Sequence, residues 1–177
     1  EALIRVELQA VGQILARGGR PPKTLIAFDA HPGNYLRDDD GRAVLVDLEK
    51  ARYGAPAFDL AHASLYTSTT WDVASQAVLT HADVASFHGA WLAAVPDALA
   101  SATSPWLLPL RRMMWLWSVT WCTKWKVQSR EAAGQAGPGE NWSAELSTDA
   151  LVAHVAERVA HYLDPETIAQ VRTDWAE

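Results

Sequence analysis

The sequence predicts a mainly α-helical domain (α+β class) that carries one small β-hairpin near its start. Apolar residues recur at three- and four-residue spacing over most of the chain, which is the period of one helix face. The dipeptide Asp40-Gly41 stands between two short apolar runs, a pattern typical of a hairpin turn. With 177 residues, 49% of them hydrophobic and 20% charged, the chain has the size and composition of one globular domain.

The elements before residue 50 are short. A helix is predicted by the apolar stripe Ile4, Leu8, Val11 and Leu15, and it ends at the glycines and prolines of segment 18–22. Residues 24–28 predict a buried strand that leads into a segment of turn-forming residues at 29–34. The two hairpin strands are predicted at 35–37 and 43–46.

From Asp59 onward the pattern is helical. One apolar stripe comprises Val84, Phe87, Trp91 and Val95, and a second comprises Leu110, Met114, Trp117, Trp121 and Trp125. The helix that carries the second stripe is expected to begin near Ser104-Pro105. Residues 134–141 interrupt the pattern. The glycine-rich stretch 134–139 is interpreted as a flexible loop. It does not replace a phosphate-binding lobe, because no apolar strand precedes it. Ser147 or Thr148 is expected to cap one further helix, and Asp164-Pro165-Glu166 to begin the last.

Charge and cysteine content restrict the partners and the compartment. A net charge of -6 has the wrong sign for general binding to nucleic acid. The single cysteine, Cys122, forms no internal disulfide and holds no structural zinc alone, which favours a reducing compartment. No signal peptide is recognisable in residues 1–15, and the apolar run 113–122 is too short to span a bilayer. A cytoplasmic protein without membrane or nucleic-acid partners is therefore expected.

Polar residues around the predicted hairpin form a possible phosphate-transfer site. If Asp40-Gly41 is a two-residue turn, Asn34 lies opposite Asp47, and their oxygen atoms can converge on one small cation such as Mg²⁺. Asp29 precedes Asn34 by the spacing with which kinase catalytic loops place a hydroxyl-orienting Asp and a metal-binding Asn. The pattern predicts that Asp29 orients the attacking hydroxyl while Asn34 and Asp47 bind magnesium.

Three segments of the chain carry a family resemblance. They are Asp29-Ala30-His31-Pro32-Gly33-Asn34, Val44-Leu45-Val46-Asp47-Leu48-Glu49 and Gly54-Ala55-Pro56-Ala57-Phe58-Asp59-Leu60-Ala61. In this order they resemble the aminoglycoside phosphotransferase and choline kinase superfamily. The resemblance implies the C-terminal lobe of a protein-kinase-like fold over 1–177. It implies a catalytic loop at 29–34, a metal-binding hairpin at 34–49 and a helical acceptor-binding region at about 60–177. It further implies Asp29 as the catalytic residue, Asn34 and Asp47 as magnesium ligands, Glu49 as an accessory metal-site residue, and Asp59 as a structural anchor of the loop.

The chain departs from the family pattern in two respects. Members of the superfamily usually carry His-Gly directly before the catalytic Asp, where this chain has Ala27-Phe28. No segment matches the N-terminal lobe with which such enzymes bind ATP. We expect that lobe in the same gene product or on a second chain. A lobe without its companion is expected to expose apolar surface, so a heteromeric partner or a homo-oligomer is also expected.

Other polar residues have ordinary explanations. His31 is interpreted as structural support of the loop through a backbone hydrogen bond, in preference to a proton shuttle or metal ligand. His154 and His161 share a helix face but lack a third ligand nearby in the sequence, so core or surface histidines are the preferred interpretation. The acidic run 38–40 is interpreted as a solvated turn rather than a metal site.

The acceptor-binding residues are the least defined part of the site. Core packing is the preferred interpretation of Trp117, Trp121 and Trp125, and the alternative places Trp117 and Trp121 in a substrate pocket that holds a cation or a ring. The polar and aromatic segment 66–72, with Trp71 and Asp72, is the best candidate for further acceptor contacts. The charge of the acceptor stays open, because acidic residues that could line a groove and basic residues nearby in the sequence are both present: Asp72, Glu131, Glu140 and Glu145 against Arg111, Arg112, Lys124 and Lys126.

Two functions agree with these observations. The first is a small-molecule kinase that uses ATP and Mg²⁺ to phosphorylate a hydroxyl group of an amino sugar, amino alcohol or related metabolite. The second is a non-catalytic, kinase-like module that binds a ligand or a partner. The three residues Asp29, Asn34 and Asp47 favour the first, because a binding module has no physical need to keep them together.

Overall fold

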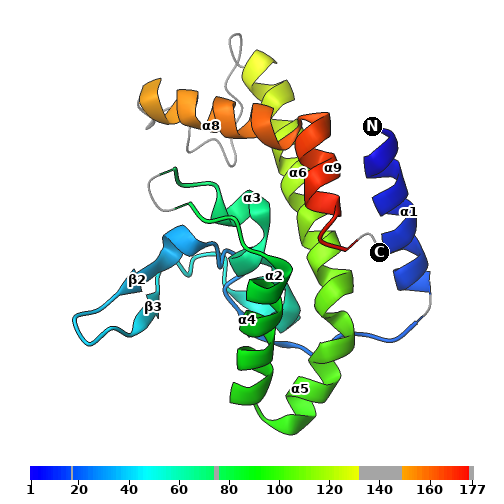
Figure 1. Cartoon of the computed structure of the whole chain (residues 1–177), viewed down its shortest axis with the longest axis vertical. Helices are drawn as coiled ribbons and strands as arrows, with labels where there is room; N and C mark the ends of the chain where they lie inside the picture. The colour runs from blue at the N-terminus through cyan, green and yellow to red at the C-terminus, as the bar shows by residue number, and fades with distance from the viewer. Residues whose placement is uncertain (17, 74–75, 132–148, 176–177) are drawn as a thin grey trace. The chain divides into compact units, whose positions relative to one another are not determined.

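The computed structural model describes residues 1–16, 18–73, 76–131 and 149–175 of the chain. Two compact units are present, Glu1–Leu116 and Trp117–Glu177, and each is described by itself. The long helix α6 (Leu107–Glu131) begins in the first unit and ends in the second. Helices dominate the described residues, beside two small antiparallel strand pairs (Figure 1), which confirms the predicted mainly α fold class.

The first unit contains most of the helices. They are α1 (Ala2–Ala16), α2 (Pro56–Ser64), α3 (Tyr66–Thr69), α4 (His81–Ala94), α5 (Asp97–Thr103), and the single 3₁₀ turns η1 (Pro32–Asn34) and η2 (Ser104–Trp106). Helix α2 starts at a proline, whose fixed backbone angle suits the first helical position. Helix α4 starts with a reciprocal capping box in which Thr80 and Asp83 each accept from the other's backbone amide.

Two strand pairs flank the loop at residues 27–34. Strand β1 (Thr24–Ile26) pairs with β4 (Arg52–Gly54), and β2 (Tyr35–Arg37) pairs with β3 (Ala43–Leu45), both antiparallel. The hairpin is therefore where the sequence predicts it. Strand β4 was not predicted from the sequence, and β1 ends before the predicted limit at residue 28.

The predicted register of the hairpin is wrong by one residue. Tyr35 pairs with Leu45, and the Val46 amide donates to the Asn34 carbonyl oxygen at 2.9 Å, so Asn34 lies opposite Val46 and not Asp47. The turn has three residues, Asp39 to Gly41, because the Asp38 backbone amide donates a hydrogen bond to the Arg42 carbonyl oxygen at 3.0 Å. Gly41 adopts a left-handed backbone with φ 80°, which adds a bulge residue that a two-residue turn lacks.

The buried face of α6 differs from the predicted stripe. Leu110 and Met114 are buried as predicted, but Trp117 is 56% exposed. The buried face instead runs through Arg111, Trp115, Val119 and Cys122. Arg111 is buried because its guanidinium group donates to the Ser64 hydroxyl oxygen at 2.7 Å and to the Ser64 carbonyl oxygen at 3.2 Å. Hydrophobicity alone does not predict a buried arginine, so the predicted stripe is rotated away from the real one.

The second unit holds α8 (Asp149–Tyr162) and α9 (Pro165–Arg172). Their buried side chains are Val155, Val159, Tyr162, Ile168 and Val171. Asp164 caps α9, and its carboxylate accepts from the Glu166 and Thr167 amides at 2.9 and 3.2 Å, as predicted. The predicted interruption at 134–141, the glycine-rich stretch 134–139 and the caps Ser147 or Thr148 lie outside the described residues. Across the described ranges, no helix combines the length and apolarity needed to cross a bilayer.

A buried ion pair joins α1 to α6 within the first unit. The Glu7 side chain is 1% exposed, and its Oε2 lies 2.7 Å from Nη2 of Arg112 and accepts from Nε at 2.8 Å. Since Glu7 lies on the first helix and Arg112 on the last helix of this unit, the pair fixes one against the other. A buried pair of this kind is costly to break, because the remaining charge keeps its desolvation penalty.

We expect Glu7→Gln to lower the free energy of unfolding by about 3 kcal/mol, as for other half-broken buried ion pairs. Urea denaturation followed by circular dichroism measures this change. The matched control is Glu1→Gln, which breaks the Glu1–Arg5 pair, whose side chains are 80% and 71% exposed. That control should leave stability nearly unchanged. Equal effects of the two substitutions would show that the α1–α6 pair is not specifically stabilising.

Candidate functional site

The loop after β1 is held by the carboxylate of Asp59. Its Oδ2 accepts from the Ala27 amide at 2.7 Å and its Oδ1 from the Phe28 amide at 2.9 Å. Asp59 lies in the first turn of α2, where the helix dipole favours a negative charge. Burial raises the pKa of Asp59, and the charge of Asp29 adds to this effect. The hydrogen bonds from the Ala27 and Phe28 backbone amides oppose it, because they stabilise the ionised carboxylate. One side chain therefore fixes the backbone immediately before Asp29.

Phe28 occupies the position where the superfamily pattern has glycine, and its backbone is left-handed with φ 60°. This conformation costs a residue with a side chain about 1–2 kcal/mol relative to the right-handed region. The Phe28 ring is held by an edge contact with Phe58 at 6.2 Å between centroids and by the Arg52 guanidinium 4.1 Å above its face. The hydrogen bond from the Phe28 backbone amide to Asp59 and these ring contacts together hold Phe28 in the strained conformation.

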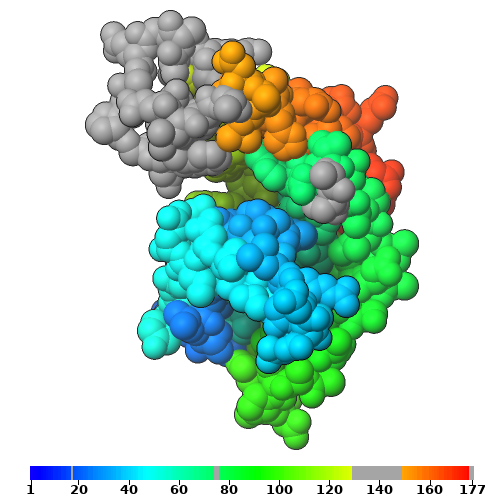
Figure 2. Space-filling view, turned by 90° about the vertical axis from the view of Figure 1, so that its left-hand side faces the viewer, coloured from blue at the N-terminus to red at the C-terminus, as the bar shows by residue number. Residues whose placement is uncertain are grey.

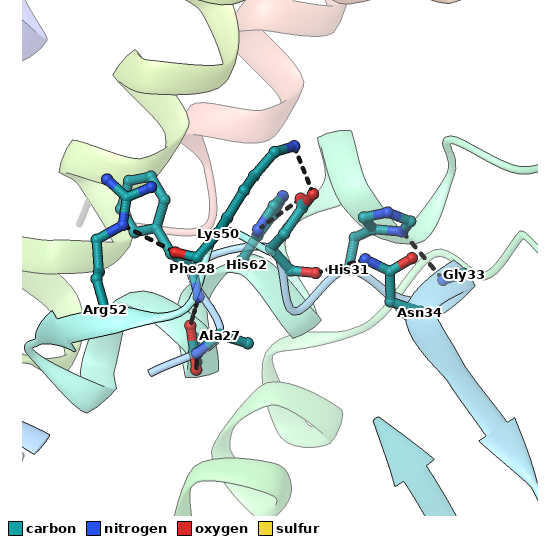
Figure 3. A network of polar contacts seen from close by, with 10 residues as sticks. Ala27, Phe28, His31, Gly33, Asn34, Lys50, Arg52 and His62 are labelled. Atoms are coloured by element: carbon teal, nitrogen blue, oxygen red, sulfur yellow. Dashed lines mark hydrogen bonds and ion pairs between the residues drawn. The ribbon is translucent and has the colours of Figure 1, made fainter. Parts of the chain in front are cut away.

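Asp29 and Asn34 are brought together across the loop, and Figure 3 labels Asn34 beside Gly33. The Asn34 side-chain amide donates to the Asp29 carbonyl oxygen at 2.9 Å, and Asn34 is 7% exposed. His31 lies between them in the chain, and its Nδ1 accepts from the Gly33 amide at 3.1 Å, which caps η1. The Asp29 side chain stays 17% exposed, so its carboxylate is within reach of a small ligand.

Two side chains that were not predicted from the sequence approach the Asp29 carboxylate (Figure 3). Lys50 Nζ donates to Oδ2 at 2.7 Å, and Nδ1 of His62 lies 3.9 Å from Oδ1. Burial would lower the pKa of Lys50, but the hydrogen bond and charge of Asp29 raise it, as do the charges of Glu49 and Asp47. Burial lowers the pKa of His62 to about 4, partly opposed by the charge of Asp29. His62 follows Asp59 by three residues on α2, and this spacing was the available sequence signal.

The residues predicted to bind magnesium lie at the base of the hairpin. Asn34 commits its amide nitrogen to Asp29, so its side-chain oxygen is the atom available to a cation. Asp47 and Glu49 are both exposed, and Asp47 has a left-handed backbone with φ 58°. Within the described residues, no three His, Cys, Asp or Glu side chains gather as a metal cluster. Mg²⁺ needs no such cluster, because it is usually held by one or two carboxylates together with substrate phosphates and water. The donor types, an amide oxygen and two exposed carboxylates, fit that requirement, but the observed register does not place Asn34 directly opposite Asp47, the pairing from which their convergence was predicted.

The predicted acceptor-binding residues fall in two places. Trp71 is half-buried and Asp72 exposed, directly after α3 in the first unit, whereas the four residues from Thr67 to Thr70 are buried. Trp117, 56% exposed, and Trp121, half-buried, belong to the second unit. The exposure of Trp117 contradicts core packing as its explanation. Acceptor binding by these four side chains stays a prediction.

Comparison with known proteins identifies the family. The model of the phosphotransferase enzyme family matches residues 2–99, which is more than half of the chain and includes the whole loop and hairpin. The chain therefore belongs to this family of phosphotransferases, and the resemblance to aminoglycoside phosphotransferases and choline kinases is confirmed at that level. Comparisons with curated proteins and with solved structures gave no match.

The strain at Phe28 can be measured with two substitutions. Phe28→Ala and Phe28→Gly both remove the ring contacts, but only glycine accepts the left-handed backbone without strain. We expect the glycine variant to be more stable than the alanine variant by about 1 kcal/mol in chemical denaturation. As a control, the same pair of substitutions at Phe87, on the exposed face of helix α4, should show the reverse order. An alanine variant at position 28 that is the more stable of the two would contradict the strained geometry.

A pH dependence of stability follows from His62. In the unfolded chain this imidazole takes up a proton near pH 6.5, whereas in the folded protein it resists protonation until about pH 4. Its contribution to stability is therefore complete above pH 6.5 and is lost as the pH falls toward 4. We expect wild type to lose about 2–3 kcal/mol of unfolding free energy relative to His62→Gln between pH 7 and pH 4, because only wild type carries this histidine.

The comparison with His62→Gln cancels the effect of other histidines. Burial, with the charge of Arg111, also lowers the pKa of His88 to about 4, and His88 is present in both proteins. Denaturation curves at several pH values measure the difference. A constant difference across this range would rule out a depressed pKa at His62.

Proposed function

We propose that this phosphotransferase is a small-molecule kinase that moves the γ-phosphoryl group of ATP to a hydroxyl group. The observation that carries the proposal is the fixed pair of Asp29 and Asn34, joined by the hydrogen bond from the Asn34 amide to the Asp29 carbonyl. Phosphoryl transfer requires mainly positioning and charge neutralisation, so a rigid loop with one accessible carboxylate is what the protein needs to supply.

Each residue of the loop has a defined task in this proposal. Asp29 accepts a hydrogen bond from the attacking hydroxyl and orients it. The Asn34 side-chain oxygen and the Asp47 carboxylate hold Mg²⁺, with Glu49 beside them, and the bound cation neutralises charge on the phosphates. Asp59 keeps the loop in place through its bonds to the Ala27 and Phe28 amides.

Lys50 supplies a positive charge close to the reacting group. It donates to Asp29 and is also in the field of Glu49 and Asp47, so it balances part of the negative charge of the three carboxylates. Lys50 is half-exposed, with 49% of its side chain accessible, and its long side chain can turn from Asp29 toward an incoming phosphate. Release of Asp29 then leaves the carboxylate to the hydroxyl acceptor.

For the acceptor, we propose an amino sugar, an amino alcohol or a related metabolite. The support is the family relationship and the sequence motif that carries the resemblance, together with the exposed Asp72 side chain of the first unit. The exposed Trp117 of the second unit is a separate candidate for acceptor binding. Aromatic faces and carboxylates are the groups that bind ammonium-bearing ligands.

We also propose that a second lobe completes the ATP site, either in the same gene product or on a second chain. Each small sheet presents an apolar cross-strand pair to solvent: Leu25 and Tyr53 are 68% and 80% exposed, and Leu36 and Val44 are 56% and 45% exposed. The segments that carry both sheets form a continuous blue and cyan part of the surface in Figure 2. Apolar surface of this kind is typical of a docking face.

Magnesium-dependent nucleotide binding tests the proposal. We expect isothermal titration calorimetry to detect ATP binding in the presence of Mg²⁺, and Asp47→Ala to weaken it at least about tenfold, since a hydrogen-bonded or coordinated charge contributes about 1.4 kcal/mol or more. Asp39→Ala is the matched control, because Asp39 is an exposed carboxylate in the turn of the same hairpin. It should bind ATP like wild type.

Turnover is then measured as ADP release with a panel of aminoglycosides and amino alcohols, together with Asp29→Asn. We expect the substitution to lower kcat about 100-fold or more, the usual contribution of a general base. Nearly undiminished turnover in Asp29→Asn would exclude the mechanism. Absence of both ATP binding and turnover, with the companion lobe present, would favour the non-catalytic binding module.

A further inference from the structure

A cavity of about 270 Å³ lies in the first unit, lined by residues of α2, α4, β1 and β2 (Figure 1). The buried side chains of Ile26 and Leu60 belong to its apolar lining. Asp29, Asn34 and Asp47 are not among the described residues that line it. The cavity is therefore built from a different set of side chains than the predicted phosphate-transfer site.

Helix α4 provides one wall of the cavity. None of its 14 residues is buried, although the sequence carries an apolar stripe there. Phe87 and Trp91 of this stripe are four positions apart, so they share a helix face, and both line the cavity. Phe87 is 38% exposed and Trp91 is half-buried. Since a helix in a protein owes most of its stability to the packing of its apolar face, the cavity leaves part of this face without a contact.

Aromatic rings and one carboxylate define the chemistry of the lining. Tyr35 of β2, 40% exposed, adds a third ring to those of Phe87 and Trp91. Among the described residues that line the cavity, Asp59 is the charged one. Its oxygen atoms accept the loop amides at 2.7 and 2.9 Å, and each oxygen of a carboxylate can accept a second hydrogen bond.

This lining matches an organic ammonium ion. The faces of aromatic rings attract cations. An ammonium group also supplies donor hydrogens and the charge opposite to that of Asp59, and a charge-assisted hydrogen bond is stronger than a neutral one. A neutral ligand uses the rings alone, and an anion is repelled by the carboxylate.

The volume of the cavity limits the size of the ligand. An apolar cavity of about 150 Å³ holds one benzene molecule, and pockets for drug-sized ligands begin at roughly 300 Å³. A cavity of about 270 Å³ therefore suits a single aromatic ring with a short chain.

We propose that this cavity binds a small arylalkylammonium ion, which is an aromatic ring joined by a short chain to a protonated amine. The ring of the ligand packs against Phe87 and Trp91, and its ammonium group donates to Asp59. Since Asp59 also accepts from the Ala27 and Phe28 amides, the ligand contacts the side chain that holds the loop. The inference does not rest on the proposed function, because this binding needs neither ATP nor a hydroxyl group.

Phenethylammonium is the probe for this site. It carries the ring and the charge but no hydroxyl group that a kinase could phosphorylate. We titrate it into the ¹⁵N-labelled full chain without ATP and follow the binding by NMR spectroscopy. We expect saturable shifts of the Trp91 indole signal, because the ring packs there. The Ala27 and Phe28 amide signals should shift with the same dissociation constant, because both amides bond Asp59.

Two further compounds separate the contributions of charge and ring without any variant of the protein. Phenylacetamide keeps the ring but is neutral, and propylammonium keeps the charge but has no ring. We expect each to bind at least about tenfold more weakly than phenethylammonium, because each lacks one of the two interactions.

Variants of the lining locate the site. We expect Trp91→Ala to weaken the binding of phenethylammonium about tenfold, as for the loss of one aromatic wall. Trp91→Phe keeps a ring at this position and should recover most of the affinity. Trp125→Ala is the matched control, because Trp125 is also a half-buried tryptophan on a helix but belongs to the second unit. It should bind the probe like wild type.

Several results would overturn the inference. They are the absence of a saturable shift at Trp91, equal affinities for phenethylammonium and phenylacetamide, and unchanged affinity in Trp91→Ala. Self-association of wild type that Trp91→Ala abolishes, measured by analytical ultracentrifugation, would also overturn it, since a second copy of the chain then covers the cavity. None of these results bears on phosphoryl transfer, which the turnover of wild type and Asp29→Asn tests separately.

Discussion

The carboxylate of Asp59 is the constraint on which the rest of the site depends. By accepting from two consecutive backbone amides, those of Ala27 and Phe28, it fixes the direction in which the chain leaves β1. The left-handed backbone of Phe28 follows from this, and the carbonyl of Asp29 then meets the Asn34 side chain. The same helix that provides Asp59 places His62 beside the Asp29 carboxylate. One turn of α2 therefore organises both the backbone and the polar environment of the loop.

The sequence predicts the loop well because its signals are local. Turn-forming residues between short apolar runs locate the hairpin, and the spacing from Asp29 to Asn34 places these residues in one loop. The register was not predictable in the same way. Whether Asp39 or Asp40 begins the turn depends on the left-handed backbone of Gly41, and an Asp-Gly pair is compatible with both turn lengths. The roles given to Asp47, Glu49, Trp71 and Trp121 stay predictions.

Contacts between distant segments account for most of what could not be predicted. Lys50 donates a hydrogen bond to Asp29, which lies 21 positions earlier in the sequence. No local sequence pattern indicates that these two residues meet. Strand β4 contains Tyr53, 80% exposed, and its pairing with β1 is decided by the backbone rather than by an alternating apolar pattern. On α6, the burial of Arg111 depends on Ser64, which belongs to α2. Hydrophobic periodicity detects the helices but not such polar partners.

The two bonds to Asp59 also have a consequence for the order of folding. Ala27 and Phe28 are separated from Asp59 by 32 and 31 positions, so the loop acquires its geometry only when a long segment has closed on itself. During synthesis, a nascent chain that ends before α2 contains every residue from Asp29 to Asn34 and still lacks the group that orders them. The strand pairing of the hairpin joins residues close in the sequence, so the hairpin can form earlier. Assembly of the reactive loop is thus a late event in the maturation of this protein.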